Sequence, residues 1–243
     1  MREIVLDTET TGFEPAEGDR IVEIGAIELM GHVPTGRTYH VYINPQRSMP
    51  AEAFEVHGIG ADLLEPPQEP KPGQQTLRDK PVFAEVGQSF LDFVGDARLV
   101  IHNAAFDMKF LNFELHRMGL PQLPMDQAVD TLAIARRRFP GSPASLDALC
   151  RRFAIDNTSR VLHGALLDSE ILAEVYLELI GGRQPDFGLA AHVSSASGGA
   201  AGDNWRPQPR PQPLPARISD EEAAAHAAFV DALGDDALWK KLA

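Results

Sequence analysis

Three short segments place carboxylates and a histidine where they could carry out hydrolytic chemistry. The first reads Asp7-Thr8-Glu9-Thr10-Thr11-Gly12. Because alternate residues of a strand point to the same face, Asp7 and Glu9 are expected to project side by side. Two adjacent carboxylates repel one another unless a cation lies between them, and hard oxygen ligands suit Mg²⁺ or Mn²⁺. In isolation such a pair is common, and a polar strand end leading into a turn is the simpler interpretation.

The other two segments lie much further along the chain. His102-Asn103-Ala104-Ala105-Phe106-Asp107 leads from a strand into a helix, so Asp107 falls near the helix start. The helix dipole alone also accounts for an acidic residue there. His163-Gly164-Ala165-Leu166-Leu167-Asp168 puts a histidine before a helix and a carboxylate on its second turn. The neighbours of Asp168 are apolar, and a lone carboxylate beside an apolar face is unusual without a partner.

Strand and helix patterns alternate from residue 1 to about residue 183. Apolar runs predict strands over residues 3–8, 20–30, 37–43 and 98–102, the first three without an intervening helix, which suggests a meander. Helical spacing and capping residues predict helices over 83–94, 108–118, 132–138, 145–153 and 165–180, the last ending at Gly181-Gly182. The pattern predicts a mixed sheet with helices on its faces, an α/β layer fold.

Charge and cysteine content limit the classes of function. The chain has 243 residues and a net charge of −13. Residues 1–183 hold 27 acidic and 17 basic side chains, which argues against a stand-alone nucleic-acid binder. If this part cuts DNA, it should bind DNA weakly by itself, and cations would have to bridge its carboxylates to phosphate. The single cysteine, Cys150, rules out a disulfide within the chain and is expected to pack inside a helix. Without a membrane-length apolar run or a signal-peptide pattern, a cytoplasmic location is expected.

The composition changes after Arg183. Residues 184–217 are rich in Pro, Gly and Ser and are predicted to be a flexible linker. Ser219-Asp220-Glu221-Glu222 fits a capping box and predicts a short helical tail over 218–243. The tail carries an apolar set too small to form a core, made of Phe229, Val230, Leu233, Leu238, Trp239 and Leu242. We therefore expect three parts: a catalytic domain over 1–183, a linker over 184–217 and a docking tail over 218–243.

Together the three motif segments resemble the DEDD exonuclease superfamily, in the subclass whose last motif carries a histidine. Within it, the chain looks most like the epsilon-subunit family of bacterial DNA polymerase III. The resemblance runs from residue 1 to about 183 and includes Ala53-Phe54-Glu55-Val56-His57-Gly58-Ile59 and Ser145-Leu146-Asp147-Ala148-Leu149-Cys150. It implies a ribonuclease-H-like fold and a proofreading 3′→5′ exonuclease that releases deoxynucleoside 5′-monophosphates. The proline-rich segment 66–81, expected to be a surface loop, looks longer than in the family.

The resemblance also implies a role for each motif residue. Asp7, Glu9 and Asp168 would bind one divalent cation, Mg²⁺ or Mn²⁺. Asp7 would also hold a second cation, and Asp107 would act at the site partly through water. His163 would be the general base, because the neutral imidazole is available near pH 7.

Further residues are expected around the terminal nucleotide and are carried over from the same resemblance. Phe13, Val56 and His57 would frame it, with His57 near its phosphate, Glu52 close to the sugar and Asn103 helping to position the substrate. Phe13 and Val56 can equally be read as core residues, and Glu52 as merely exposed. Two neighbouring features are expected to be structural: Asp130 as a helix cap and Arg136-Arg137-Arg138 as a solvated face.

The expected partners are a DNA 3′ end and the polymerase catalytic subunit, bound through residues 218–243. Gln184-Pro185-Asp186-Phe187-Gly188-Leu189 resembles a short sliding-clamp-binding peptide, although an ordinary linker start explains it as well. Two alternatives stay open. An RNA-trimming or oligonucleotide-degrading exonuclease of the same superfamily would share the chemistry but needs no tether. A non-catalytic nucleic-acid scaffold would be expected to lack at least one motif carboxylate or the histidine.

Overall fold

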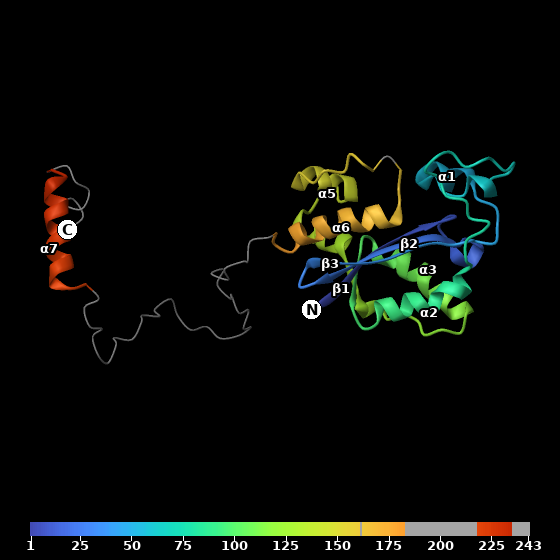
Figure 1. Cartoon of the computed structure of the whole chain (residues 1–243), viewed down its shortest axis with the longest axis horizontal. Coiled ribbons are helices and arrows are strands. Elements are labelled where there is room, and N and C mark those ends of the chain that lie inside the picture. The colour runs from blue at the N-terminus through green and yellow to red at the C-terminus, as the bar shows by residue number, and fades with distance from the viewer. Residues whose placement is uncertain (161, 183–217, 235–243) are drawn as a thin grey trace. The chain divides into compact units, whose positions relative to one another are not determined.

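The computed structural model describes residues 1–160, 162–182 and 218–234 (Figure 1). The chain divides into two units, Met1–Ala190 and Ala191–Ala243. The predicted linker over 184–217, the clamp-like peptide at 184–189 and the tail residues Leu238, Trp239 and Leu242 lie outside the described residues. Among the described residues, no helix has the length and apolar content needed to cross a membrane.

A five-stranded mixed sheet forms the centre of the first unit. Its strands are β1 (Arg2–Thr10), β2 (Ile21–Met30), β3 (Val33–Tyr42), β4 (Arg98–Ile101) and β5 (Ala128–Asp130), in the order β3-β2-β1-β4-β5. The first three strands pair antiparallel, which confirms the predicted meander, and β4 and β5 add in parallel. The short β5 was missed because three half-buried residues give no period to detect. Strand β3 also begins four residues earlier than predicted.

Helices cover both faces of the sheet, as Figure 1 shows. One face packs against α2 (Phe83–Val94) and α3 (Ala104–Arg117), and the other against α4 (Thr131–Arg138), α5 (Leu146–Phe153) and α6 (Ala165–Leu179). The side chains of β1 alternate between the two faces of the sheet. Ile4 and Leu6 pack in a first core with α2 and α3, and Val5 packs in a second core with α4, α5 and α6. The α/β layer fold predicted from the sequence is confirmed.

Local sequence signals set several helix boundaries. The Asp130 carboxylate accepts the Leu132 N–H at 2.9 Å, so it caps α4 as predicted, and the Ser145 hydroxyl accepts the Ala148 N–H at the start of α5. Cys150 is fully buried in the second core, as expected. Helix α3 begins at Ala104 rather than Met108, so Asp107 lies in its first turn.

A smaller third core lies beyond the meander. It joins α1 (Ala51–His57) and the 3-10 turn Ala61–Leu63 to the segment that follows. The sequence did not predict α1, which has seven residues and no side-chain cap. The proline-rich segment 66–81 is mostly exposed, as expected of a surface loop, but Leu77 is fully buried in this core. Two further 3-10 turns lie at Pro15–Glu17 and Met125–Gln127.

The second unit contributes α7 (Asp220–Ala232) to the described residues. Ser219 and Glu222 form the predicted capping box, with the Glu222 N–H donating to the Ser219 hydroxyl at 3.2 Å. None of the helix residues is buried. Phe229 and Leu233 are 63% and 51% exposed, so α7 and its C-terminal end present large apolar side chains on the surface of this unit.

Gly25 of β2 allows the start of α6 to approach the sheet. A Cβ at this position would collide with the backbone of Ala165 and Leu166. Two hydrogen bonds hold the contact: the Ser169 hydroxyl donates to the Gly25 carbonyl at 2.9 Å, and the Ala165 N–H donates to a carboxylate oxygen of Glu23 at 3.0 Å. The position of Asp168 therefore depends on Gly25 of β2 having no side chain.

We predict that Gly25→Ala destabilises the protein by about 1–3 kcal/mol, the usual cost of forcing a methyl group into a packed interface. Urea unfolding would measure it. Gly164→Ala is the matched control, because a Cβ there meets nothing within 4 Å and the backbone is extended. Equal destabilisation by the two variants would contradict the close-approach role of Gly25.

Candidate active site

The five predicted catalytic residues line one cavity of about 330 Å³. Asp7 and Glu9 come from the end of β1, on the face that Val5 turns toward α6. Asp107 comes from the first turn of α3, and His163 and Asp168 come from the approach to α6 and its first turn. Segments about 100 and 160 residues from β1 thus meet at the end of the central strand.

A hydrogen bond between the first two motifs fixes Asp107. The Thr8 hydroxyl donates to Asp107 Oδ1 at 2.7 Å, and both residues are buried. Thr8 points to the opposite face of β1 from its neighbours Asp7 and Glu9, toward α3. The strand therefore supplies two carboxylates on one side and the support for a third on the other.

Burial and mutual repulsion make these carboxylates hard to ionise. Desolvation, and then the charges of Asp107 and Glu9, hold the pKa of Asp7 well above its ordinary value. Desolvation and the nearby Glu23 raise the pKa of Glu9 to about 9. Desolvation raises the pKa of Asp107 to about 7, although the Thr8 hydrogen bond opposes the shift. A cation among them would remove this penalty.

The donor atoms fit a hard divalent cation. Ligand atoms of Glu9, His163 and Asp168 all lie within 4.8 Å of one another. Asp7 and Asp107 are not part of that group, but they line the same cavity. A set dominated by carboxylate oxygens matches the ligands that Mg²⁺ and Mn²⁺ prefer.

Arg160 is the residue at this site that the sequence analysis missed. Its Nε and Nη2 donate to the two carboxylate oxygens of Asp168 at 2.5 and 2.7 Å, and its Nη1 donates to Asp147 Oδ1 at 2.8 Å. The Arg160 side chain is only 8% exposed. The one clue in the sequence was that Arg160 lies three residues before His163. A single arginine in a loop, however, is usually a surface residue, so the sequence offered no reason to select it.

His163 lies at the open side of the cavity, with its side chain 47% exposed. Its backbone N–H donates to the Val56 carbonyl at 3.1 Å, which ties the loop to α1. Desolvation and the neighbouring Arg160 charge lower the pKa of the imidazole. The neutral form therefore dominates near pH 7, as a general base requires.

A second, more apolar cavity of about 560 Å³ adjoins the carboxylates through Thr8, Glu9 and Phe106. It is lined by four of the residues predicted to bind substrate, Phe13, Glu52, Val56 and His57. Phe13 and Val56 are 81% and 47% exposed, so the interpretation of them as core residues is wrong.

His57, one of those four, and Asn103, the fifth predicted substrate residue, differ in their surroundings. His57 is buried, its Nδ1 accepts the Ile59 N–H at 3.0 Å, and desolvation lowers its pKa to about 4. It is therefore neutral and offers no positive charge to a phosphate. Asn103 takes a left-handed conformation (φ 66°) before α3 and lines neither cavity; its N–H donates to Asp130 at 3.1 Å.

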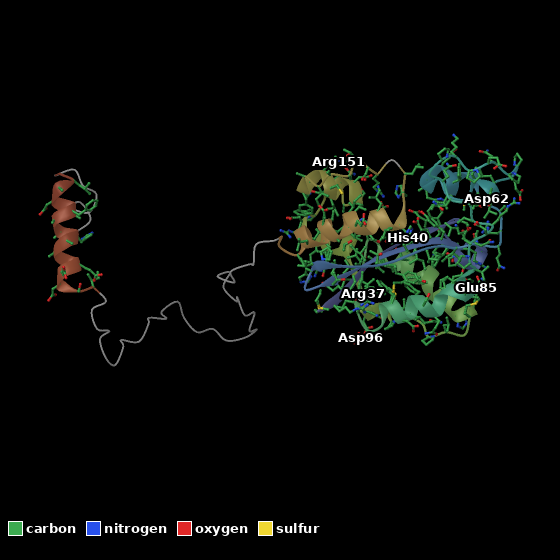
Figure 2. All side chains as sticks on the ribbon, viewed as in Figure 1. Arg37, His40, Asp62, Glu85, Asp96 and Arg151 are labelled. Carbon is green, nitrogen blue, oxygen red and sulfur yellow. The ribbon has the colours of Figure 1, made fainter. Side chains whose placement is uncertain are left out.

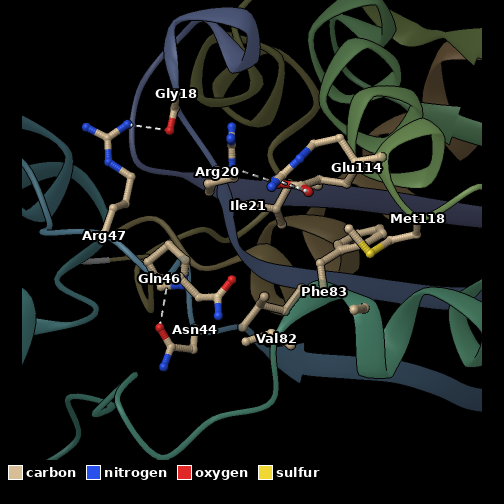
Figure 3. A pocket seen from close by; sticks show the side chains of 14 residues that line it. Gly18, Arg20, Ile21, Asn44, Gln46, Arg47, Val82, Phe83, Glu114 and Met118 are labelled. Atoms are coloured by element: carbon tan, nitrogen blue, oxygen red, sulfur yellow. Dashed lines mark hydrogen bonds and ion pairs between the residues drawn. The ribbon is translucent and has the colours of Figure 1, made fainter.

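A third cavity, of about 250 Å³, is lined by arginines but lacks the catalytic residues (Figure 3). Arg20 meets the buried Glu114 at 3.6 Å, and Arg47 donates to the Gly18 carbonyl at 2.7 Å. These cations already have partners in the fold. Arg138, from the predicted solvated face, likewise donates to the carbonyls of Glu178 and Leu179.

Comparison with known proteins assigns the chain to a family. The family model described as "Exonuclease" matches residues 4–176. The chain is 52% identical over 190 residues to the DNA polymerase III subunit epsilon of Rickettsia felis, covering 77% of each protein. It is 42% identical over 250 residues to the protein of that name from Escherichia coli (strain K12), covering 98% of the chain and 97% of the relative. The chain belongs to the exonuclease family, among the DNA polymerase III epsilon subunits.

Solved structures agree on the fold. Exonuclease X in complex with 5′-overhanging duplex DNA matches with a TM-score of 0.52 and 24% identity, over 73% of this chain and 90% of that one. The nuclease domain of 3′hExo, a DEDDh family member bound to rAMP, matches with a TM-score of 0.56 and 18% identity, over 74% and 91%. The ribonuclease-H-like fold is confirmed, and the enzyme is a 3′→5′ exonuclease.

We predict that Glu9→Gln stabilises the metal-free protein by about 1–3 kcal/mol at pH 8. Because folding raises the pKa of Glu9 from 4.5 to about 9, its contribution to stability is full below pH 4.5 and is lost as the pH rises toward 9. The amide cannot ionise, so the variant should lose less stability over that range. Thermal unfolding in EDTA from pH 5 to 9 measures this, with the exposed Glu55→Gln as control. Parallel pH profiles for the wild type and Glu9→Gln would contradict the electrostatic account.

Proposed function

We propose that this enzyme is the proofreading subunit of a bacterial replicative DNA polymerase. It would remove mismatched 3′-terminal nucleotides as deoxynucleoside 5′-monophosphates. The observation that carries the proposal is the meeting of Asp7, Glu9, Asp107, His163 and Asp168 in one cavity, in a chain that aligns with an epsilon subunit over 98% of its length. A cytoplasmic location follows from the same assignment.

The buried carboxylates would hold two divalent cations, Mg²⁺ or Mn²⁺. Asp7, Glu9 and Asp168 would bind the first, Asp7 would also bind the second, and Asp107, held by Thr8, would support the site partly through water. When bound, such cations acidify a water molecule and offset the charge of a phosphodiester during in-line displacement. The chain's own contribution is a buried, oxygen-rich site already shaped for them.

The proton of the attacking water would pass to the neutral imidazole of His163. Its half-exposed position at the mouth of the cavity leaves room for a substrate beside it. The adjoining 560 Å³ cavity would hold the terminal nucleotide, with Phe13 and Val56 offering apolar surface to the base and Glu52 the sugar. Neutral His57 would act there as a hydrogen-bonding or shape-determining residue rather than as a charge, and Asn103 would act on the substrate only from outside the cavity.

An exonuclease that trims RNA or short oligonucleotides is the alternative. The epsilon relatives, together with a tail helix that leaves Phe229 and Leu233 exposed, favour the polymerase-associated function. The retained carboxylates and His163 disfavour a non-catalytic scaffold. Matched DNA and RNA strands in a degradation assay distinguish the two exonucleases.

We predict that His163→Ala lowers the rate of hydrolysis by roughly 10²–10⁴-fold, the usual contribution of a general base. Protonation of His163 should make the wild-type rate fall at low pH. This acidic limb of the rate–pH curve should lie below pH 6.5, because the pKa of His163 is lowered from that value. The variant should lose that limb while keeping the stabilisation that Mn²⁺ gives the folded protein. A variant that retains the wild-type rate–pH profile would show that the proton goes elsewhere.

The tail over 218–243 would bind the polymerase catalytic subunit. Helix α7 has no buried residues, and exposed apolar side chains of this kind often anchor a protein contact. A tether would raise the local concentration of the exonuclease near the primer end to the order of millimolar. This would offset the weak DNA affinity expected of a chain with net charge −13. The peptide at 184–189 would add a weak contact with a sliding clamp.

We predict that deleting residues 218–243 leaves hydrolysis of single-stranded DNA by the isolated chain nearly intact and abolishes stable association with the polymerase. Gel filtration of the mixed proteins at micromolar concentration measures association, and mismatch excision during synthesis should fall with it. Gln184→Ala with Phe187→Ala serves as a matched linker variant that should keep polymerase binding. Coelution of the truncated chain with the polymerase would show that the main anchor lies elsewhere.

A further inference from the structure

Arg160 makes the shortest ion pair among the described residues of the active site. Its guanidinium forms a two-point pair with Asp168, at 2.5 and 2.7 Å, and both side chains are almost fully buried, 8% and 5% exposed. A planar two-point pair of this kind uses both oxygens of the carboxylate. The carboxylate that the proposed function assigns to a cation is therefore already neutralised by a side chain of the same chain.

The same guanidinium also engages His163. Arg160 Nη2 lies 2.9 Å from His163 Nδ1, and a guanidinium can only donate, so Nδ1 must be the acceptor. The neutral imidazole then carries its proton on Nε2, and its free lone pair is taken by Arg160. In this arrangement His163 cannot accept a proton from water at that nitrogen.

Asp147 is a second carboxylate partner for Arg160. Arg160 Nη1 donates to Asp147 Oδ1 at 2.8 Å, and Asp147 is 44% exposed. The Asn157 side chain also donates to the same Asp147 oxygen, Oδ1, at 3.0 Å, which helps to hold the carboxylate in place. If Asp168 were given to another cation, Arg160 would still keep one carboxylate partner.

We propose that Arg160 is a built-in placeholder for the cation: in the metal-free enzyme it pairs with Asp168 and donates to His163 Nδ1, and cation binding breaks both contacts and leaves Arg160 paired with Asp147 alone. The exchange frees both oxygens of Asp168 and the lone pair of His163 in one movement. It also keeps Asp168 paired with a positive charge in both states, which avoids leaving that buried carboxylate unpaired. The inference rests on the proposed metal site and adds a positioning residue to it.

The test is Mn²⁺ binding to the full chain at pH 8, measured by calorimetry and by thermal unfolding in EDTA and in Mn²⁺. Arg160→Gln should bind Mn²⁺ at least about tenfold more tightly than wild type, because a full positive charge no longer competes for Asp168. Its melting temperature should be lower than wild type in EDTA, and the difference should shrink or vanish in Mn²⁺. Arg160→Lys, which keeps the charge but not the two-point geometry, should fall in between. Arg151→Gln, an exposed arginine on α5 (Figure 2), removes one positive charge away from the site and should change neither quantity.

Asp147→Asn gives the opposite expectation. Without its second partner Arg160 should hold Asp168 more persistently, so Mn²⁺ should bind more weakly than to wild type. In the Arg160→Gln background the same substitution should have a much smaller effect, since coupled residues are not additive.

The outcomes separate this inference from the proposed function. If wild type gains no stability from Mn²⁺ and binds none, both fail. If wild type binds Mn²⁺ but Arg160→Gln binds it no more tightly, or melts below wild type by the same amount with and without Mn²⁺, the proposed function stands and the placeholder role is wrong. Additive effects of the two substitutions would likewise contradict the exchange.

Discussion

Repulsion among buried carboxylates at the end of β1 is the constraint on which the rest of the structure depends. Asp7, Glu9, Asp107 and Asp168 line one cavity, with Glu23 buried close behind them. Such a cluster costs free energy in proportion to its burial, so the surrounding fold must hold it together, and bound cations would offset that cost. Desolvation and the neighbouring charges raise the pKa values of Asp7, Glu9 and Asp107, which is consistent with that cost. The carboxylates that would bind the catalytic cations are thus the same groups that make the metal-free fold less stable.

The fold meets this constraint by fastening two distant segments, the starts of α3 and α6, to the neighbouring strands β1 and β2. Thr8 reaches across β1 to hold Asp107 of α3. On the other face, Gly25 admits the start of α6, and Glu23 accepts the Ala165 N–H at 3.0 Å, so contacts with β2 set the backbone of α6 that carries Asp168. His40 lies 2.7 Å from the other oxygen of Glu23, which leaves this buried carboxylate partnered on both sides. The carboxylates are therefore positioned by residues that take no part in the chemistry.

The sequence predicted the strands and helices whose apolar residues recur at a regular spacing, and the capping residues that match a known pattern. The apolar β1 run, the helical spacing of Phe83, Val86, Phe90 and Val94, and the caps at Asp130 and Ser145 all reappear in the structure. Strand β5 and helix α1 were missed because three and seven residues give too little pattern. Arg160 was missed for a different reason. Its importance comes from contacts with Asp147, His163 and Asp168 that depend on how a loop folds back between α5 and α6, and no local pattern encodes them.

The central claim is that these carboxylates are assembled to bind catalytic cations. The most direct measurement is anomalous diffraction from crystals of the full chain grown with Mn²⁺, collected at the manganese edge. We expect anomalous peaks within coordination distance of Asp7 and Asp168, with the two-point pair between Arg160 and Asp168 broken. Manganese bound only elsewhere on the protein, with that pair intact, would contradict it.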